Sequence, residues 1–215
     1  MTLSAAIAFL SDVGVDFEGY LPTLYVVMEL PAFFVALLLV ASQLKVDTEQ
    51  TQSIGEIARV ALTGKTFLLL GGGVVIGLLS GETGKARVEP FFFDLFSGML
   101  TLFLLQMGTV VGERLGELRD LKLFVWVFSF VAPTVHAVLA IALGTLVGLS
   151  PGGAFILGII ASSASFISAP AIVRANIPDA NPGIYMTSAM ILAFPFNILL
   201  GMPIYYEFAL LVGGR

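Results

Sequence analysis

Apolar runs long enough to cross a lipid bilayer recur along this chain. We expect spanning segments at residues 21–44, 66–80, 91–111, 123–148, 152–174 and 183–212. A soluble core could not bury so many runs of this length, since 58% of the 215 residues are hydrophobic and only 12% are charged. Backbone groups in hydrocarbon need partners within their own segment, which favours helices for segments this long. The sequence therefore predicts an all-α polytopic membrane protein.

The remaining composition excludes several classes of function. The chain has no cysteine and a single histidine, His136, which excludes disulfides, thiolate metal sites and histidine-rich metal clusters. It contains no hydrolase motif and no phosphate-binding glycine loop, so we expect it not to be an enzyme. The sequence contains no basic patch of the kind that binds nucleic acids. Basic residues are concentrated after the first, third and fifth segments, which assigns those loops to the cytoplasm.

The fifth segment contains a run of hydroxyl groups. Ser162, Ser163, Ser165 and Ser168 interrupt an apolar stretch and are followed by Pro170. A helix broken inside the bilayer leaves amide and carbonyl groups free, and these are tolerated where they line a cavity and bind ions. Small hydroxyl side chains let a ligand approach and can donate to an anion or accept from a cation. The alternative is a kinked helix whose serines bond carbonyls one turn earlier.

Three polar residues inside other predicted spans are further candidates. Glu29 lies two residues before Pro31 and is expected to face a polar interior, as a coupling group or as a structural one. Asn197 follows Pro195 and is expected to cap freed carbonyls or to contact a ligand. His136 fits an interhelical hydrogen bond better than a proton relay.

The chain also shows traces of an internal repeat. A shift of 164 positions aligns the N-terminal region with the later one and pairs Ser4 with Ser168, Ala5 with Ala169, Gly19 with Gly183, Thr23 with Thr187 and Pro31 with Pro195. Because the later copy belongs to a unit of five spans, successive units would be inverted across the membrane. We therefore expect a two-repeat transporter of which this chain holds about one and a third repeats. The expected parts are the end of the first repeat at 1–44, a half-helix plus its last transmembrane helix; a cytoplasmic linker at 45–65; and a second five-helix repeat at 66–215.

Four motifs in combination resemble a known family. They are GELR, ASSAS…S.P, R..IP.ANP..Y and FP.N…G.P.Y, and together they resemble the C-terminal half of the sodium-dependent bicarbonate transporter family typified by cyanobacteria. YVVMELPAFFVALLLVA is similar to the last helix of that family's first repeat. The resemblance implies ten helices in two inverted repeats, with a gate moiety packed on a core moiety. It also implies a homotrimer in the plasma (inner) membrane, with a possible cytoplasmic PII-like regulator and no cofactor other than sodium as the coupling ion.

The resemblance extends to individual site residues. The expected substrate-binding residues are Thr2, Ser4, Ser163, Ser165, Phe166, Ile167 and Ser168, and the expected sodium ligands are Ser162, Ser163, Ser165 and Asn197. The chain departs from the family where Phe166 replaces an aspartate, and where Ala169 and Ala171 replace a glycine and a proline. The expected function is sodium-dependent import of bicarbonate by symport with alternating access. The alternatives are transport of another small anion and a non-transporting membrane scaffold.

Overall fold

The secondary structure of the described residues is helical, with short turns and loops between the helices. The computed structural model describes residues 2–25, 27–28, 31–32, 35, 65–91, 95–165, 170, 173 and 180–214, and no strand occurs among them. The chain divides into two compact units, the first formed by Met1–Leu21, Pro90–Phe166 and Gly183–Arg215, and the second by Pro22–Glu89 and Ile167–Pro182. The residues of the candidate site that the structure describes belong to the first unit.

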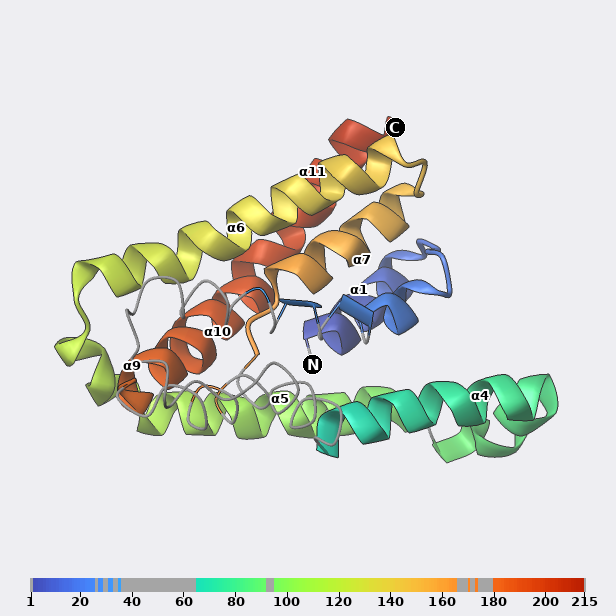
Figure 1. Ribbon diagram of the computed structural model, residues 1–215, viewed down its shortest axis with the longest axis horizontal. Coiled ribbons are helices and arrows are strands. Elements are labelled where there is room, and N and C mark those ends of the chain that lie inside the picture. The colour runs from blue at the N-terminus through green and yellow to red at the C-terminus, as the bar shows by residue number, and fades with distance from the viewer. Residues whose placement is uncertain are drawn as a thin grey trace, which may run out of the picture. The chain divides into compact units, whose positions relative to one another are not determined.

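Figure 1 labels the described helices along the chain. In chain order they are α1 (Thr2–Val13), α4 (Lys65–Glu89), α5 (Phe96–Glu113), the 3-10 helix η2 (Leu115–Asp120), α6 (Leu123–Leu146), α7 (Pro151–Ser162), α9 (Pro182–Met186), the π-helix η3 (Thr187–Ala193), α10 (Phe194–Phe196), the π-helix η4 (Asn197–Gly201) and α11 (Met202–Gly213).

Three of these helical stretches are long and apolar enough to cross a membrane. They are Phe96–Glu113, Leu123–Leu146 and the continuous stretch Pro182–Gly213, at three of the positions predicted from sequence. In the second unit, α4 contains the predicted segment 66–80 and is interrupted at Gly81, whose φ of 56° is left-handed. Most of the first predicted span, 21–44, lies outside the described residues. The all-α polytopic membrane class is confirmed.

The turn between α6 and α7 is specified by its own sequence. Gly148 has a φ of +88°, and the amide of Leu149 donates to the carbonyl of Gly144 at 3.0 Å, which together close α6 with a Schellman motif. Ser150 then caps α7, because its hydroxyl accepts from the amide of Gly153 at 3.0 Å, and Pro151 occupies the first turn. The two helices therefore form an antiparallel hairpin.

α7 is the central helix of the first unit and is apolar on all sides. It packs against α6, α11 and α1, as Figure 1 shows for the orange ribbon, and most of its residues are buried. Close approach to α6 depends on glycine, since a Cβ on Gly158 would lie 2.6 Å from Cγ1 of Ile141. The 12 residues of α7 extend about 18 Å, which is well short of a hydrocarbon core of about 30 Å. α7 is thus a half-helix that ends inside the protein.

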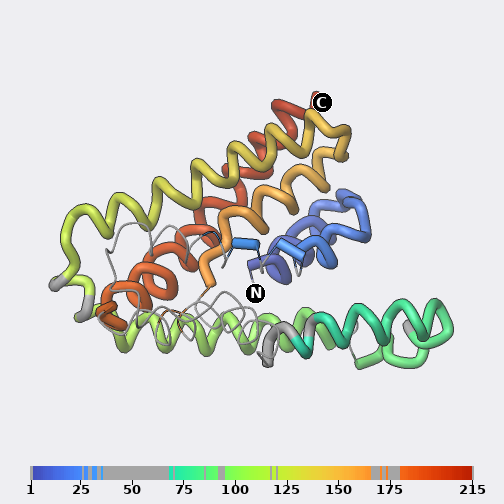
Figure 2. The backbone as a smooth tube through the Cα atoms, viewed as in Figure 1, coloured from blue at the N-terminus to red at the C-terminus, as the bar shows by residue number. Residues whose placement is uncertain are grey.

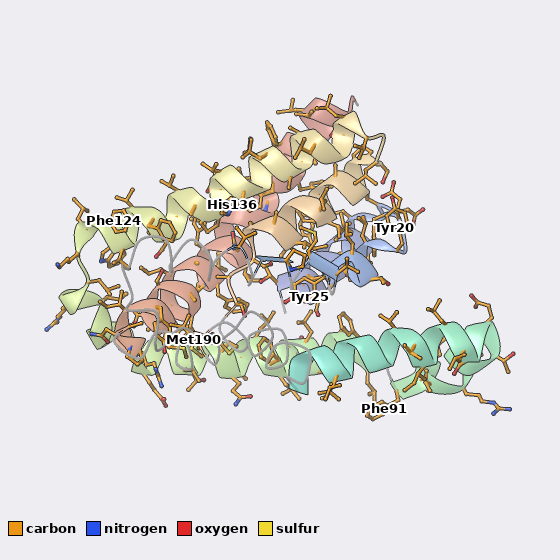
Figure 3. All side chains as sticks on the ribbon, in the orientation of Figure 1. Tyr20, Tyr25, Phe91, Phe124, His136 and Met190 are labelled. Carbon is orange, nitrogen blue, oxygen red and sulfur yellow. The ribbon has the colours of Figure 1, made fainter. Side chains whose placement is uncertain are left out.

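The outer face of α6 is made of large apolar side chains. Phe124, which Figure 3 shows projecting away from the neighbouring helices, is 74% exposed, and Leu139 and Leu143 are exposed as well. Such a surface is unfavourable in water and matches the hydrocarbon of a bilayer. The first unit therefore presents a lipid-compatible exterior around the buried α7.

Candidate substrate and ion site

The serine run coincides with a break in the fifth segment. α7 ends at Ser162, and Ser163 has an extended backbone with φ −68° and ψ 131°. Ser163–Ser165 are not helical. The interruption predicted among the serines is therefore observed on its N-terminal side. Its far side, with the predicted site residues Phe166, Ile167 and Ser168, lies outside the described residues.

Two of the serine hydroxyls bond back to their own helix. Ser162 Oγ donates to the carbonyl of Ile159 at 3.2 Å, and Ser163 Oγ donates to the same carbonyl at 2.6 Å. These are the bonds of the alternative interpretation, although they occur at a helix end and not at a kink. A hydroxyl has one proton and two acceptor positions, so each oxygen that donates to Ile159 keeps lone pairs for a further donor or a cation. The pair is better suited to bind a cation than to donate to an anion.

A buried amide caps the carbonyl at which α7 ends. Asn197 Nδ2 donates to the carbonyl oxygen of Ser162 at 2.9 Å, and the Asn197 side chain is completely buried. The hydroxyl of Tyr205 donates to Asn197 Oδ1 at 3.2 Å. Thr134 Oγ1 lies 3.4 Å from the Tyr205 hydroxyl and donates to the carbonyl of Phe130 at 2.8 Å. A polar chain therefore runs from α6 through α11 to the broken end of α7.

Asn197 is presented by an irregular part of the last span. It is the first residue of η4, and this π-helical stretch lies between Pro195 in α10 and Pro203 in α11. Proline lacks an amide proton and disrupts the regular ladder, and π-helical turns occur often at functional sites. The irregular backbone thus aims an amide side chain at the neighbouring half-helix.

A second short helix, α1, lies antiparallel to α7. Glu18, in the turn after α1, accepts a hydrogen bond from the amide of Ser150 at 2.8 Å and one from the hydroxyl of Ser150 at 3.2 Å, at the start of α7. Farther along, the rings of Phe9 and Phe155 pack with their centroids 5.8 Å apart. Since α1 and α7 both have 12 residues, the N-terminal end of α1 comes to the level at which α7 ends. Figure 2 shows α1 in blue and α7 in orange in the same part of the view.

The predicted residues at the start of α1 are therefore brought to the break. Thr2 is buried, Ser4 is half-buried, and α1 contacts η4 as well as α7. A helix N-terminus carries partial positive charge and a C-terminus partial negative charge. The start of α1 thus offers partial positive charge and the end of α7 partial negative charge beside hydroxyl groups, a combination suited to a small anion and a small cation.

Comparison of the sequence with known protein families gives a match. The sequence profile of the Na+-dependent bicarbonate transporter superfamily matches residues 1–210. The chain belongs to this superfamily. No curated protein matches the chain. Membership of a transporter superfamily, together with the apolar helices, indicates a multi-pass membrane protein.

Within this Na+-dependent bicarbonate transporter superfamily member, the other predicted residues are distributed unevenly. Ser162 and Asn197 are in direct contact, and Ser163 and Ser165 follow as half-buried residues. Whether these side chains bind substrate or sodium stays a prediction. Glu29 lies outside the described residues. His136 is exposed on α6 (Figure 3), on a different face from the buried residues that pack on α7.

The described residues contain no group of three or more histidine, cysteine, aspartate or glutamate side chains that could hold a metal ion. Hydroxyl and carbonyl oxygens are the oxygen ligands that the broken helix offers. Such neutral oxygens fit a monovalent cation that must be released again, whereas a carboxylate-rich cage would bind a divalent ion tightly.

Sequence reasoning missed three residues that shape the site. Glu18 accepts a hydrogen bond from Ser150, 132 positions away, which no local pattern indicates. Tyr205 donates to Asn197, eight residues earlier on the same helix. Gly201 faces the ring of Tyr205. The available signal was the motif FP.N…G.P.Y, whose asparagine, glycine and tyrosine are four residues apart and so lie on one helix face.

Proposed function

We propose that this protein imports bicarbonate together with sodium across the plasma membrane by alternating access. The observation that carries the proposal is the half-helix α7, which ends among serines inside the first unit, in a chain of the Na+-dependent bicarbonate transporter superfamily. Broken helices of this kind supply ion and substrate sites in secondary transporters.

The polarity of the site supports two adjacent ligands of opposite charge. Sodium is proposed to bind at the negative end of α7, with oxygens from Ser162, Ser163 and Ser165 and with Asn197 as a neighbour. Bicarbonate is proposed to bind near the positive end of α1 and the residues that follow the break. In this arrangement Thr2, Ser4, Ser163 and Ser165 act with Phe166, Ile167 and Ser168 as substrate contacts.

Proximity of the two charges explains how transport is coupled. A bound cation lowers the free energy of an anion beside it in a low-dielectric site, and by linkage the anion strengthens cation binding by the same factor. Neither solute alone would then saturate the site at its working concentration. The state with both ligands bound would be the one that moves across the membrane, which is the condition for symport.

Phe166 bears on which anion the protein transports. The family aspartate would add a negative charge near the sodium site, and phenylalanine removes it. Fewer negative ligands weaken sodium binding and leave the substrate pocket more apolar. Transport of another small anion is therefore the second candidate function, and this residue is the observation that favours it.

Uptake of isotopic bicarbonate into proteoliposomes tests the proposal. At mildly alkaline pH, an inward sodium gradient should drive uptake, whereas an equal potassium gradient should not, with protein-free vesicles as the control for diffusion of carbon dioxide. Equal uptake in potassium would refute sodium coupling. Stronger sodium-driven uptake of a competing anion such as formate would replace bicarbonate as the substrate. Absence of any uptake, by protein that is folded, would favour the scaffold alternative.

A second measurement tests the residues of the site. Ser165→Ala and Ser168→Ala should each abolish sodium-dependent bicarbonate binding while the protein still folds, because each substitution removes a single hydroxyl group. Isothermal titration with bicarbonate in sodium buffer measures the affinity. Unchanged affinity would remove the altered serine from the site. The homotrimer and the PII-like regulator are further proposals for this membrane protein, and each is open to a direct mass or pull-down measurement.

A further inference from the structure

Three residues on one face of the last span are in contact with one another: Asn197, Gly201 and Tyr205. They are four residues apart along the continuous helix of η4 and α11, so they lie above one another on the same face. The Tyr205 side chain extends toward the N-terminal end of its helix, as helical side chains do, and its hydroxyl reaches Asn197 Oδ1. Tyr205 is 1% exposed, so water does not replace this contact.

Gly201 makes room for the contact. A Cβ at this position would lie 2.9 Å from Cε2 of Tyr205 and 3.0 Å from Oδ1 of Asn197. Both distances are shorter than ordinary van der Waals contact, so any larger residue would push the ring and the amide apart. The glycine and the tyrosine of the FP.N…G.P.Y motif are thus explained by a single hydrogen bond.

The same hydrogen bond decides which way the amide faces. The Ser162 carbonyl can only accept, so the Asn197 amide must turn its Nδ2 toward it. Oδ1 then faces Tyr205, which donates to it. Without the hydroxyl, Oδ1 loses its donor, and only the bond to the Ser162 carbonyl still holds the amide in its orientation.

We propose that Tyr205 is a positioning residue for the sodium site. Through Asn197 it holds the Ser162 carbonyl, and thereby the last turn of α7, from which the oxygens of Ser162 and Ser163 project. Tyr205 itself does not touch the ion. The inference deepens the proposed function and rests on it for the choice of sodium, whereas the ordering of the helix end by Tyr205 is independent of transport.

The matched variants are Tyr205→Phe and Tyr206→Phe. Each removes one hydroxyl from neighbouring residues of α11, but the Tyr206 ring packs on Phe9 and Phe155, with centroids 5.3 and 5.7 Å away. Tyr205→Phe should raise the half-saturating sodium concentration roughly tenfold, a change of about 1.4 kcal/mol. It should leave the KM for bicarbonate at saturating sodium unchanged. Tyr206→Phe should change neither value, and a merely structural loss would lower the maximal rate instead.

A double variant tests whether Tyr205 acts through the amide. Asn197→Ala should raise the half-saturating sodium concentration at least as much as Tyr205→Phe does. Because the tyrosine has nothing left to orient, the combination of both substitutions should be no worse than Asn197→Ala alone. Additive effects of the two substitutions would contradict action through Asn197.

Hydrogen exchange gives a readout that needs no transport. Amides in residues 158–165 should exchange faster in Tyr205→Phe than in the wild type and in Tyr206→Phe, because the last turn of α7 loses its external support. The half-saturating sodium concentration is measured in two ways, from the rate of uptake and from the rise in the midpoint of thermal unfolding as sodium is added. Wild-type protein that shows no sodium response refutes the proposed function. Unchanged exchange, or an unchanged sodium response beside an active wild type, overturns the role of Tyr205.

Discussion

Replacing Glu18 by alanine should lower the stability of the protein, because Glu18 joins the turn after α1 to the start of α7. The Glu18 carboxylate accepts from the amide and the hydroxyl of Ser150, whose oxygen in turn accepts from the amide of Gly153. The side chain also lies so close to Gly153 that a Cβ there would overlap the carboxylate. A negative group is thereby held at the positive end of α7. Its loss removes both hydrogen bonds and the favourable charge.

The expected cost follows from those contacts. A hydrogen bond to a charged group contributes about 1.5–3 kcal/mol when buried, and a carboxylate at a helix N-terminus adds about 0.3–1 kcal/mol. Glu18 is only half-buried, and solvent screening reduces both contributions. We therefore expect Glu18→Ala to lower stability by about 1–2 kcal/mol, which for a chain of this size corresponds to a fall in Tm of about 2–8 °C.

Thermal unfolding in detergent, followed by the fluorescence of Trp126, measures this change, since Trp126 is the single tryptophan of the chain. Glu18→Gln keeps one acceptor oxygen for the Ser150 amide and should fall between the wild type and Glu18→Ala. Asp16→Asn is the matched control, because Asp16 is exposed in the same turn and its replacement removes the same charge. If Glu18→Ala and Asp16→Asn have the same Tm, the contact between Glu18 and Ser150 contributes nothing to stability and the reasoning is refuted.

Three further outcomes are expected. Gly158→Val should destabilise the protein by about 1–3 kcal/mol, because its side chain would meet Ile141 on α6, whereas the same change at the unpacked Gly108 should cost less; equal Tm values would contradict this packing. Ser163→Ala should raise the half-saturating sodium concentration about tenfold, whereas Ser163→Thr, which keeps the hydroxyl, should have the wild-type value. Identical sodium titrations for the wild type and both variants would remove Ser163 from the ion site. His136→Ala should leave sodium-dependent uptake unchanged, since His136 is exposed on α6 away from the break, and loss of uptake in a well-folded variant would show that this face takes part in transport.

The fold was predictable where one physical rule dominates. Segments such as 123–148 and 183–212 are apolar over a bilayer thickness, and hydrocarbon admits only helices at that length. The end of α7 was predictable for a related reason, because four serines before a proline disfavour a continued buried helix. The turn at Gly148–Ser150–Pro151 carries its own local signals, namely a helix-ending glycine, a capping serine and a proline in the first turn.

The rest of the site depends on contacts that local patterns do not encode. Glu18 reaches Ser150 across 132 positions of sequence, and Asn197 reaches Ser162 across 35. Asn197 was singled out because it follows a proline, yet its partner could not be named from the sequence. The serines were expected to donate to an anion or to accept from a cation, with bonds to carbonyls one turn earlier as the alternative, and Ser162 and Ser163 do donate to the carbonyl of Ile159. Only the packing of α7 against the last span decides between these arrangements.

A helix that ends in a membrane protein's interior must find donors for its last carbonyls. At the end of α7 the carbonyls of Ile159, Ile160 and Ser162 receive them from two serine hydroxyls, the Ser163 amide and the Asn197 amide. All of these donors are neutral, so the negative end of the helix dipole is not cancelled and still attracts a cation. Because these three carbonyls are satisfied from within, the binding free energy of an ion is not needed to form this end of α7. That free energy can shift the balance between conformations. An ion required for folding could not leave in every transport cycle, whereas an ion drawn to an already satisfied helix end can.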